Sequence, residues 1–189
     1  MGHSRTIMSP WTTLFIAVLV SCSSGDGEPT APAPAHPINP IPDNLWRPIP
    51  PVTGNWVLIQ SESGDWVGQG RRWVITPDST PVFFPASTPP GVVMIAHPWQ
   101  ASPAPMQSLA QLEKGYYPNV GRFPSESHGG SDWGGDGRGC NEVSGWFAID
   151  SIRYAGDTLM VLEVRAEQYC DGGTAPLHGA IHWRRPPPP

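Results

Sequence analysis

The stretch GWFAIDSIRYAGDTLMVLEVRAEQY, residues 145–169, decides the fold class. Apolar and polar side chains alternate along both of its halves, and β-branched and aromatic residues are frequent. This period of two is typical of strands that bury one face. Ala155-Gly156-Asp157 separates the halves and favours a tight turn. We therefore predict an antiparallel hairpin over residues 145–169.

Short apolar runs separated by Gly, Pro, Asp and Ser continue this pattern on both sides of the hairpin. The predicted strands are Asn55–Ser61, Arg71–Thr76, Pro81–Phe84, Val92–His97, Leu109–Leu112, Gly145–Tyr154, Thr158–Tyr169 and Leu177–Arg184. Met106–Lys114 is the best helix candidate, but it is short. Many short strands between turn signals predict an all-β fold, an antiparallel β-sandwich or barrel-like domain that ends in a three-strand meander. The domain is expected over residues 54–185.

The N-terminus has the features of an export signal. A polar segment with Arg5 precedes an apolar run of about ten residues, Trp11–Val20, which is half the length of a membrane-spanning helix. Leu19-Val20-Ser21-Cys22 resembles the lipobox of bacterial lipoproteins. The resemblance implies that residues 1–21 are a cleaved signal peptide and that Cys22 carries the lipid. A plain secretory signal with a chance cysteine is the alternative.

The resemblance also implies a location. In lipoproteins an Asp after the lipidated cysteine retains the protein at the inner membrane, and this chain has Ser23 there. We therefore expect a lipid-anchored protein of the cell envelope, at the outer membrane. The proline-rich residues 22–53 are predicted to form a polyproline II spacer, and Pro186–Pro189 a frayed tail.

Composition limits the partners. The net charge is −5, and Lys114 is the one lysine of the chain, so nothing favours a nucleic-acid partner. With Cys22 assigned to the lipid, Cys140 and Cys170 remain as a pair in an oxidising compartment, and we interpret them as a disulfide. Two free thiols or half of a metal site are the alternatives, although no CxxC pattern supports a metal. The two cysteines precede and follow the predicted hairpin, whose antiparallel strands would place them close together.

A second resemblance covers Gly54–Trp183. The chain is similar to a β-rich domain of uncharacterised function found in secreted and surface proteins of bacteria. The elements that carry the likeness are Ser61–Gly70, Gly115–Tyr117 with Arg122, Asp136–Asn141 with Gly145–Phe147, and Gln168–Gly173 with Leu177–Gly179. The likeness implies an extracellular domain with a Cys140–Cys170 pair, and it implies no activity. Asp171, where Glu is commoner, and the insert Ser125–Trp133 depart from the pattern.

The glycine-rich loop Gly129–Gly139 invites two site hypotheses. A phosphate-binding loop would need a Gly-Lys-Ser/Thr ending that opens a helix, and both features are missing from the sequence. Asp132, Asp136 and Asn141 are candidate oxygen ligands for Ca²⁺, although the spacing is not that of an EF-hand. The simpler interpretation is a turn-rich loop without a metal, and no cofactor is expected.

Signals for catalysis are weak. The chain has no Gly-x-Ser-x-Gly elbow. Glu62, Asp65 and Asp136 are candidate carboxylates for glycoside hydrolysis, but sequence gives no separation between them. His178 and His182 share one face of a predicted strand and could form a pair. The corresponding hypothesis, a secreted hydrolase acting on envelope or extracellular polysaccharide, is kept as the alternative function.

Tryptophan is the remaining signal, because the chain has nine. Trp66, Trp133 and Trp146 are the candidates for exposed rings that bind a ligand, whereas core packing is the competing interpretation for each. We therefore predict a non-catalytic binding or structural module, held to a membrane by its lipid, with a glycan or a protein as its ligand.

Overall fold

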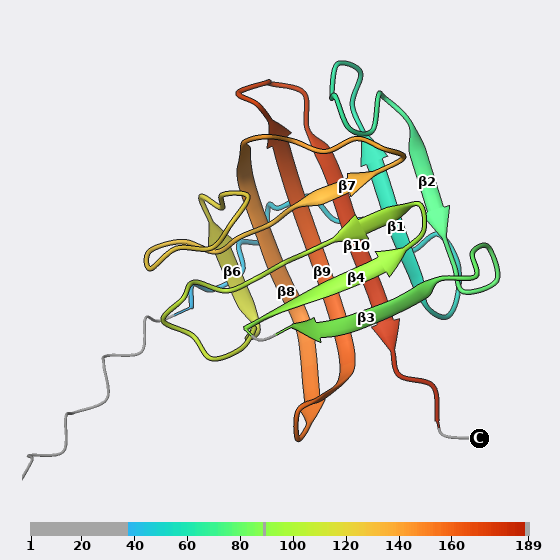
Figure 1. Ribbon diagram of the computed structural model, residues 1–189, viewed down its shortest axis with the longest axis vertical. Coiled ribbons are helices and arrows are strands. Elements are labelled where there is room, and N and C mark those ends of the chain that lie inside the picture. The colour runs from blue at the N-terminus through green and yellow to red at the C-terminus, as the bar shows by residue number, and fades with distance from the viewer. Residues whose placement is uncertain (1–37, 89, 188–189) are drawn as a thin grey trace, which may run out of the picture. The chain divides into compact units, whose positions relative to one another are not determined.

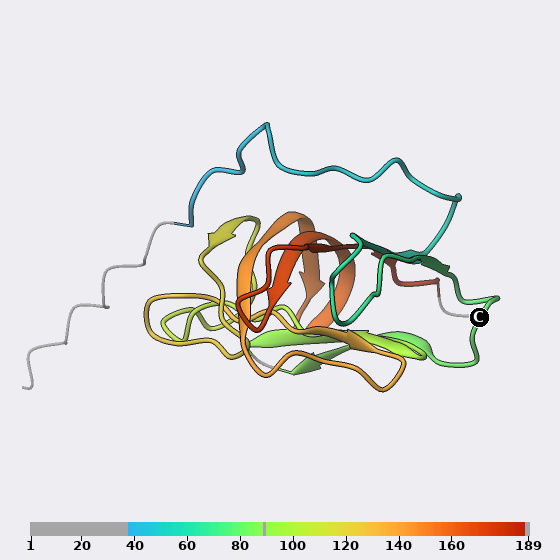
Figure 2. The same cartoon turned by 90° about the horizontal axis from the view of Figure 1, so that it is seen from above.

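The computed structural model describes residues 38–88 and 90–187, and within them the chain forms ten strands and no helix. The strands make two antiparallel sheets that pack face to face (Figure 1, Figure 2). They are β1 (Trp56–Ser61), β2 (Arg72–Ile75), β3 (Phe83–Thr88), β4 (Gly91–Ala96), β5 (Trp99–Ala101), β6 (Gly115–Pro118), β7 (Trp133–Gly135), β8 (Val143–Ala155), β9 (Thr158–Cys170) and β10 (Leu177–Arg184). The predicted all-β sandwich is confirmed.

The larger sheet has six strands in the order β2-β1-β10-β9-β8-β6. Its centre is the predicted meander β8-β9-β10, in which Ala155 pairs with Thr158 across a tight turn. Gly156 has a φ of 57° in this turn, a conformation that glycine adopts without strain. Gly145 is needed for a different reason: a Cβ there would overlap the carbonyl oxygen of Glu167 on the neighbouring strand.

The smaller sheet has four strands in the order β3-β4-β5-β7. Sequence periodicity missed β5, β6 and β7, which have only three or four residues each. The predicted strand Leu109–Leu112 is wrong, and the weak helix candidate Met106–Lys114 is not a helix, since this segment forms turns and bends. Its leucines were misleading because they are buried within an irregular segment.

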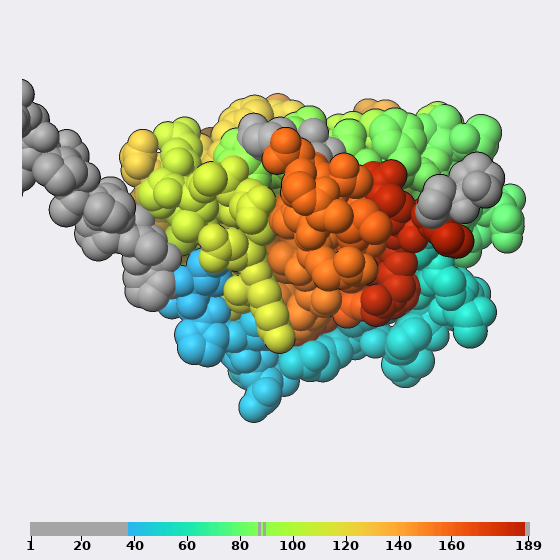
Figure 3. Space-filling model, turned by 90° about the horizontal axis from the view of Figure 1, so that it is seen from below, coloured from blue at the N-terminus to red at the C-terminus, as the bar shows by residue number. Residues whose placement is uncertain are grey.

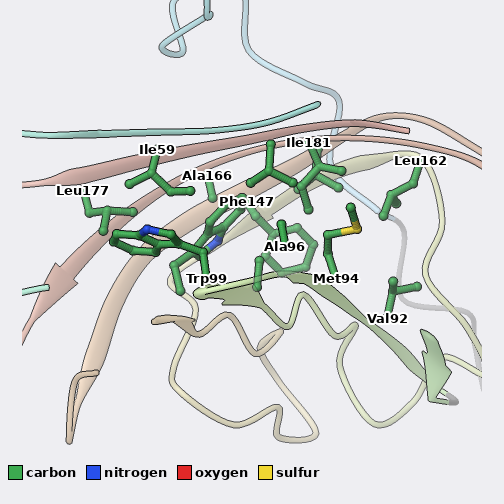
Figure 4. Packing of buried hydrophobic residues seen from close by; sticks show 14 of the residues in the cluster. Ile59, Val92, Met94, Ala96, Trp99, Phe147, Leu162, Ala166, Leu177 and Ile181 are labelled. Carbon is green, nitrogen blue, oxygen red and sulfur yellow. The ribbon is translucent and has the colours of Figure 1, made fainter. Parts of the chain in front are cut away.

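The core lies between the two sheets, and tryptophan fills much of it (Figure 4). Trp99 of β5 and Trp133 of β7 are almost completely buried, as is Phe147 of β8. The rings of Tyr117 and Phe147 stack with their centroids 4.3 Å apart. The Tyr117 hydroxyl donates to the carbonyl of Glu113 and accepts from the Glu113 amide. Burial, the largest influence, raises the pKa of Tyr117 to about 12.

The disulfide between Cys140 and Cys170 is present, with the two Cα atoms 5.1 Å apart. Cys140 stands just before β8, and Cys170 ends β9, where it pairs with Val143. The bridge therefore closes the end of the hairpin that is opposite to its turn, as the sequence predicts.

Residues 38–54, which we call the strap, run along the outer face of the six-stranded sheet (Figure 2). Figure 3 shows the strap, in blue and cyan, on the opposite side of β8–β10 from the four-stranded sheet, in green. Trp46 stacks on His178 of β10 with ring centroids 4.8 Å apart, and its carbonyl accepts a bond from Arg165 of β9 at 2.7 Å. The predicted linker boundary at residue 53 is therefore too late, because packing begins near Ile38, which contacts the core.

The predicted signal peptide 1–21, Cys22 and the linker as far as residue 37 lie outside the described residues. So do Pro188 and Pro189 of the predicted tail. Within the described part of the chain there is no helix long and apolar enough to cross a membrane.

Candidate functional site

A hollow of about 420 Å³ opens on the outer face of the four-stranded sheet, the face turned toward the viewer in Figure 1. Along β4, Val92, Met94 and Ala96 point into the core, so Ile95 points outward and contributes an apolar wall. Gln100 of β5 is exposed and lines the same hollow. The alternation of the strands thus gives this face one apolar and one amide side chain at neighbouring positions.

Glycines form much of the remaining wall, at positions 134, 135, 137 and 139. A Cβ on Gly134 would lie 3.1 Å from the carbonyl oxygen of Arg138, so a side chain there would crowd the backbone beside the hollow. Beyond β7 the chain reverses in a tight turn, where Asp136 and Gly137 have φ angles of 53° and 76°. Aspartate and glycine tolerate this left-handed conformation, which explains the Gly-Asp-Gly sequence.

Arg122 and Asp132 form the first charged pair of the hollow. The Arg122 Nε donates to Asp132 Oδ2 at 3.3 Å, and the two side chains are 38% and 17% exposed. Asp132 Oδ1 is buried and has no hydrogen-bond partner among the described residues. Because Asp132 is so enclosed, the arginine compensates a charge that would otherwise be poorly solvated. The Arg122 guanidinium also lies 5.4 Å from the centroid of the Phe123 ring.

Arg138 and Asp136 form the second charged pair. The Arg138 Nη2 donates to Asp136 Oδ2 at 2.9 Å, and the Arg138 Nε donates to the carbonyl of Val67 at 2.9 Å. Asp136 is 54% exposed. Each arginine of the hollow therefore stands beside an aspartate, of which Asp132 lines the hollow and Asp136 lies next to it, so donors and acceptors occur together. This combination suits a ligand that carries hydroxyl groups, which both donate and accept.

Of the three predicted aromatic candidates, one is exposed and two are buried. Trp66 is 58% exposed, as the hypothesis requires. The expected exposure of Trp133 is wrong: it is 0% exposed and packs in the core, where its ring contacts Gly179. Trp146 is only 8% exposed, and its indole N–H donates to Glu167 at 3.2 Å. Trp146 and its neighbour Phe147 lie on opposite faces of β8, and neither of them is exposed.

The calcium candidates do not converge. Asp132 and Asp136 each pair with an arginine, and Asn141 lies at an exposed position beyond the turn. The described residues contain no group of three or more His, Cys, Asp and Glu side chains placed to hold a metal ion.

The predicted hydrolase carboxylates do not converge either. Asp65 is 4% exposed, accepts a bond from the Ser61 hydroxyl at 2.8 Å, and also accepts from the amide of Gly68. Asp65 therefore shapes its own loop. Glu62 is exposed at the start of that loop and is absent from the lining of the hollow, to which Asp136 is attached only through Arg138.

The two histidines of β10 do not pair with each other. His178 stacks on Trp46 and lies 2.9 Å from Glu167, whereas His182 stacks on Trp56 and lies 3.5 Å from Glu163. They belong to the face that the strap crosses. A second hollow, of about 310 Å³, lies between the strap prolines and this face.

Comparison with known proteins returns no match. No family model matches the chain, and no curated protein or solved structure does so either. The site is therefore defined by its geometry. Sequence reasoning did not single out Gln100 or the two arginine–aspartate pairs as a site, although both arginines belong to motifs that carry the surface-domain resemblance.

Proposed function

We propose that this chain is a lipid-anchored protein of the bacterial cell envelope, at the outer membrane, whose sandwich binds a glycan without cleaving it. The lipobox-like Leu19–Cys22 supports the anchor. The observation that carries the binding role is the hollow on the open face of the four-stranded sheet, with its two arginine–aspartate pairs.

The pairs favour binding over proton transfer. A glycosidase of the usual kind needs one carboxylic acid that holds a proton and a second carboxylate that acts as base or nucleophile. Asp132 and Asp136 each accept a bond from a guanidinium group, and Asp136 does not line the hollow, so the lining holds one carboxylate where a glycosidase needs two. The same pairs are well suited to hydroxyl groups, because donor and acceptor stand next to each other.

Binding is best tested at Gln100. Its side chain is exposed, so Gln100→Ala should leave the fold intact, whereas a change at Arg122 would leave Asp132 without its ion-pair partner. Full-length lipidated protein in detergent is titrated calorimetrically with a panel of neutral and acidic polysaccharides. Loss of one hydrogen bond, about 1 kcal/mol, should weaken binding about fivefold.

The matched control is Gln60→Ala, because Gln60 is also an exposed strand glutamine but lies on β1 of the other sheet. It should bind as the unchanged protein does. If none of the polysaccharides binds, the proposed role is contradicted. If the protein releases reducing sugar from a polysaccharide that it binds, the hydrolase hypothesis is favoured instead.

A further inference from the structure

Each of the two arginines of the hollow contacts a segment that carries an exposed aromatic side chain. Arg138, at the end of β7, donates to the carbonyl of Val67, and the residue next to Val67 is Trp66, which is 58% exposed. Arg122, before β7, lies against the ring of Phe123, which is 72% exposed. The two aromatic residues therefore belong to segments that reach the hollow at its two charged pairs.

These segments lie at opposite ends of β7. The connection between β1 and β2, which contains Trp66, meets the turn that follows β7, whereas Phe123 belongs to the connection that leads from β6 into β7 (Figure 1). The hollow therefore lies between the segment that carries Trp66 and the segment that carries Phe123. A ligand that contacts all three has to be elongated and to run along β7.

The loop that carries Trp66 is held in one conformation by its own buried polar groups. Asp65 accepts from the Ser61 hydroxyl and the Gly68 amide, and the Ser61 hydroxyl accepts from the Gly70 amide at 3.0 Å. A ring presented on such a loop loses little conformational entropy when it binds. Large exposed apolar rings on fixed segments are common anchors for ligands.

We propose that the site accommodates an oligosaccharide chain of several units, with hydroxyl groups in the hollow and sugar faces on Trp66 and Phe123. This inference rests on the proposed glycan-binding function and adds the length of the ligand. The C–H face of a sugar ring is apolar and slightly positive, and it packs on the negative face of an aromatic ring. Because each arginine is already paired with an aspartate, the site favours uncharged sugars over acidic ones.

The test compares ligands of increasing length. Neutral oligosaccharides of one to six units, from the cello-, chito- and manno-series, are titrated into the full-length protein in detergent. Affinity should rise by about tenfold or more between one unit and four to six, because the longer chains add two stacking contacts. Equal affinity at all lengths would overturn the extended site while leaving glycan binding itself intact.

Variants separate the ends of the site from its centre. Trp66→Ala and Phe123→Ala should each reduce the affinity for the long ligands by about threefold to tenfold. Each should change the affinity for the shortest ligand by less than about twofold. Gln100→Ala should weaken all lengths alike. Phe84→Ala is the control, because Phe84 is 47% exposed on β3, at the far edge of the same sheet from β7.

Three further outcomes count against the inference. If Trp66→Ala weakens short and long ligands equally, or if Phe84→Ala has the same effect as Phe123→Ala, the aromatic side chains do not mark the ends of a site. If none of the three series binds, the proposed function fails for neutral glycans, and the inference fails with it.

Discussion

Removal of the Asp150 carboxylate should destabilise the sandwich by about 3–5 kcal/mol, because it leaves a buried arginine without a counter-charge. The Arg165 side chain is only 5% exposed and donates to both Asp150 oxygens, at 2.6 Å and 2.8 Å. Its third bond, to the Trp46 carbonyl, brings no negative charge. Since Asp150 itself is 27% exposed, solvent screens part of the pair, and the lower end of the range is the better expectation.

For Asp150→Ala, a loss of about 3 kcal/mol corresponds to a fall in Tm of roughly 6–12 °C in a domain of this size. The free energy of unfolding is measured by urea denaturation, followed by circular dichroism. Glu126→Ala is the control, because Glu126 is an exposed acidic residue, and its removal should cost less than about 0.5 kcal/mol. The double change Asp150→Ala with Arg165→Met should recover much of the loss, because an apolar chain then fills the space of the charged one.

Two results would refute this reasoning about the ion pair. One is a cost below about 1 kcal/mol for Asp150→Ala, which would mean that Arg165 reaches solvent by moving the strap. The other is a double variant as unstable as Asp150→Ala alone, because packing and not charge would then be the cause.

Three more predictions concern the rest of the chain. Cys140→Ala combined with Cys170→Ala should lower the free energy of unfolding by about 3–4 kcal/mol, since the bridge closes a loop with a sequence separation of 30. Urea denaturation measures this loss, and an unchanged midpoint would contradict the prediction. The pKa of Tyr117 is raised to about 12, so the unfolded chain loses the hydroxyl proton at a lower pH than the folded chain does. The free energy of unfolding should therefore fall by about 1.4 kcal/mol per pH unit between pH 10 and 12. Denaturation at several pH values measures this slope, and Tyr117→Phe should reduce it. Cys22→Ser should release the protein from membranes and abolish labelling by radioactive fatty acid, and a variant that stays labelled and membrane-bound would refute lipidation at this cysteine.

The hairpin of β8 and β9 could be predicted from sequence because both strands have 13 residues, long enough for the period of two to be counted. The strand β7 could not be predicted, because Trp133-Gly134-Gly135 has no alternation. The backbone of β7 is bound by a side chain that is distant in sequence. The side-chain amide of Gln168 accepts a hydrogen bond from the backbone N–H of Trp133 at 2.8 Å and donates one to the Trp133 carbonyl at 2.9 Å. An interaction across 35 residues leaves no local signal.

The same contact explains why the exposure of Trp133 was mispredicted. A tryptophan in a glycine-rich loop is expected to face solvent, because such loops lie at the surface. Here Gln168 holds the backbone of β7 against the other sheet, and the small residue Gly179 leaves space for the indole ring. The glycines therefore permit close packing of a large side chain. Gln100 and the two arginines were missed for a related reason, since only the fold shows that they line one hollow.

The strap covers an apolar part of the outer face of the six-stranded sheet. Trp56, Leu58 and Ala180 form a small apolar cluster on the outer face of the six-stranded sheet, and Trp46 of the strap packs against it. A fragment that begins at Gly54, the boundary that composition suggests, would lack Trp46 and leave this cluster uncovered. Such a fragment would expose an apolar patch that the longer chain covers, and binding there would be misleading. Because the strap covers this cluster, we expect the intact chain to bind its ligand on the open face of the four-stranded sheet, where the larger of the two hollows lies.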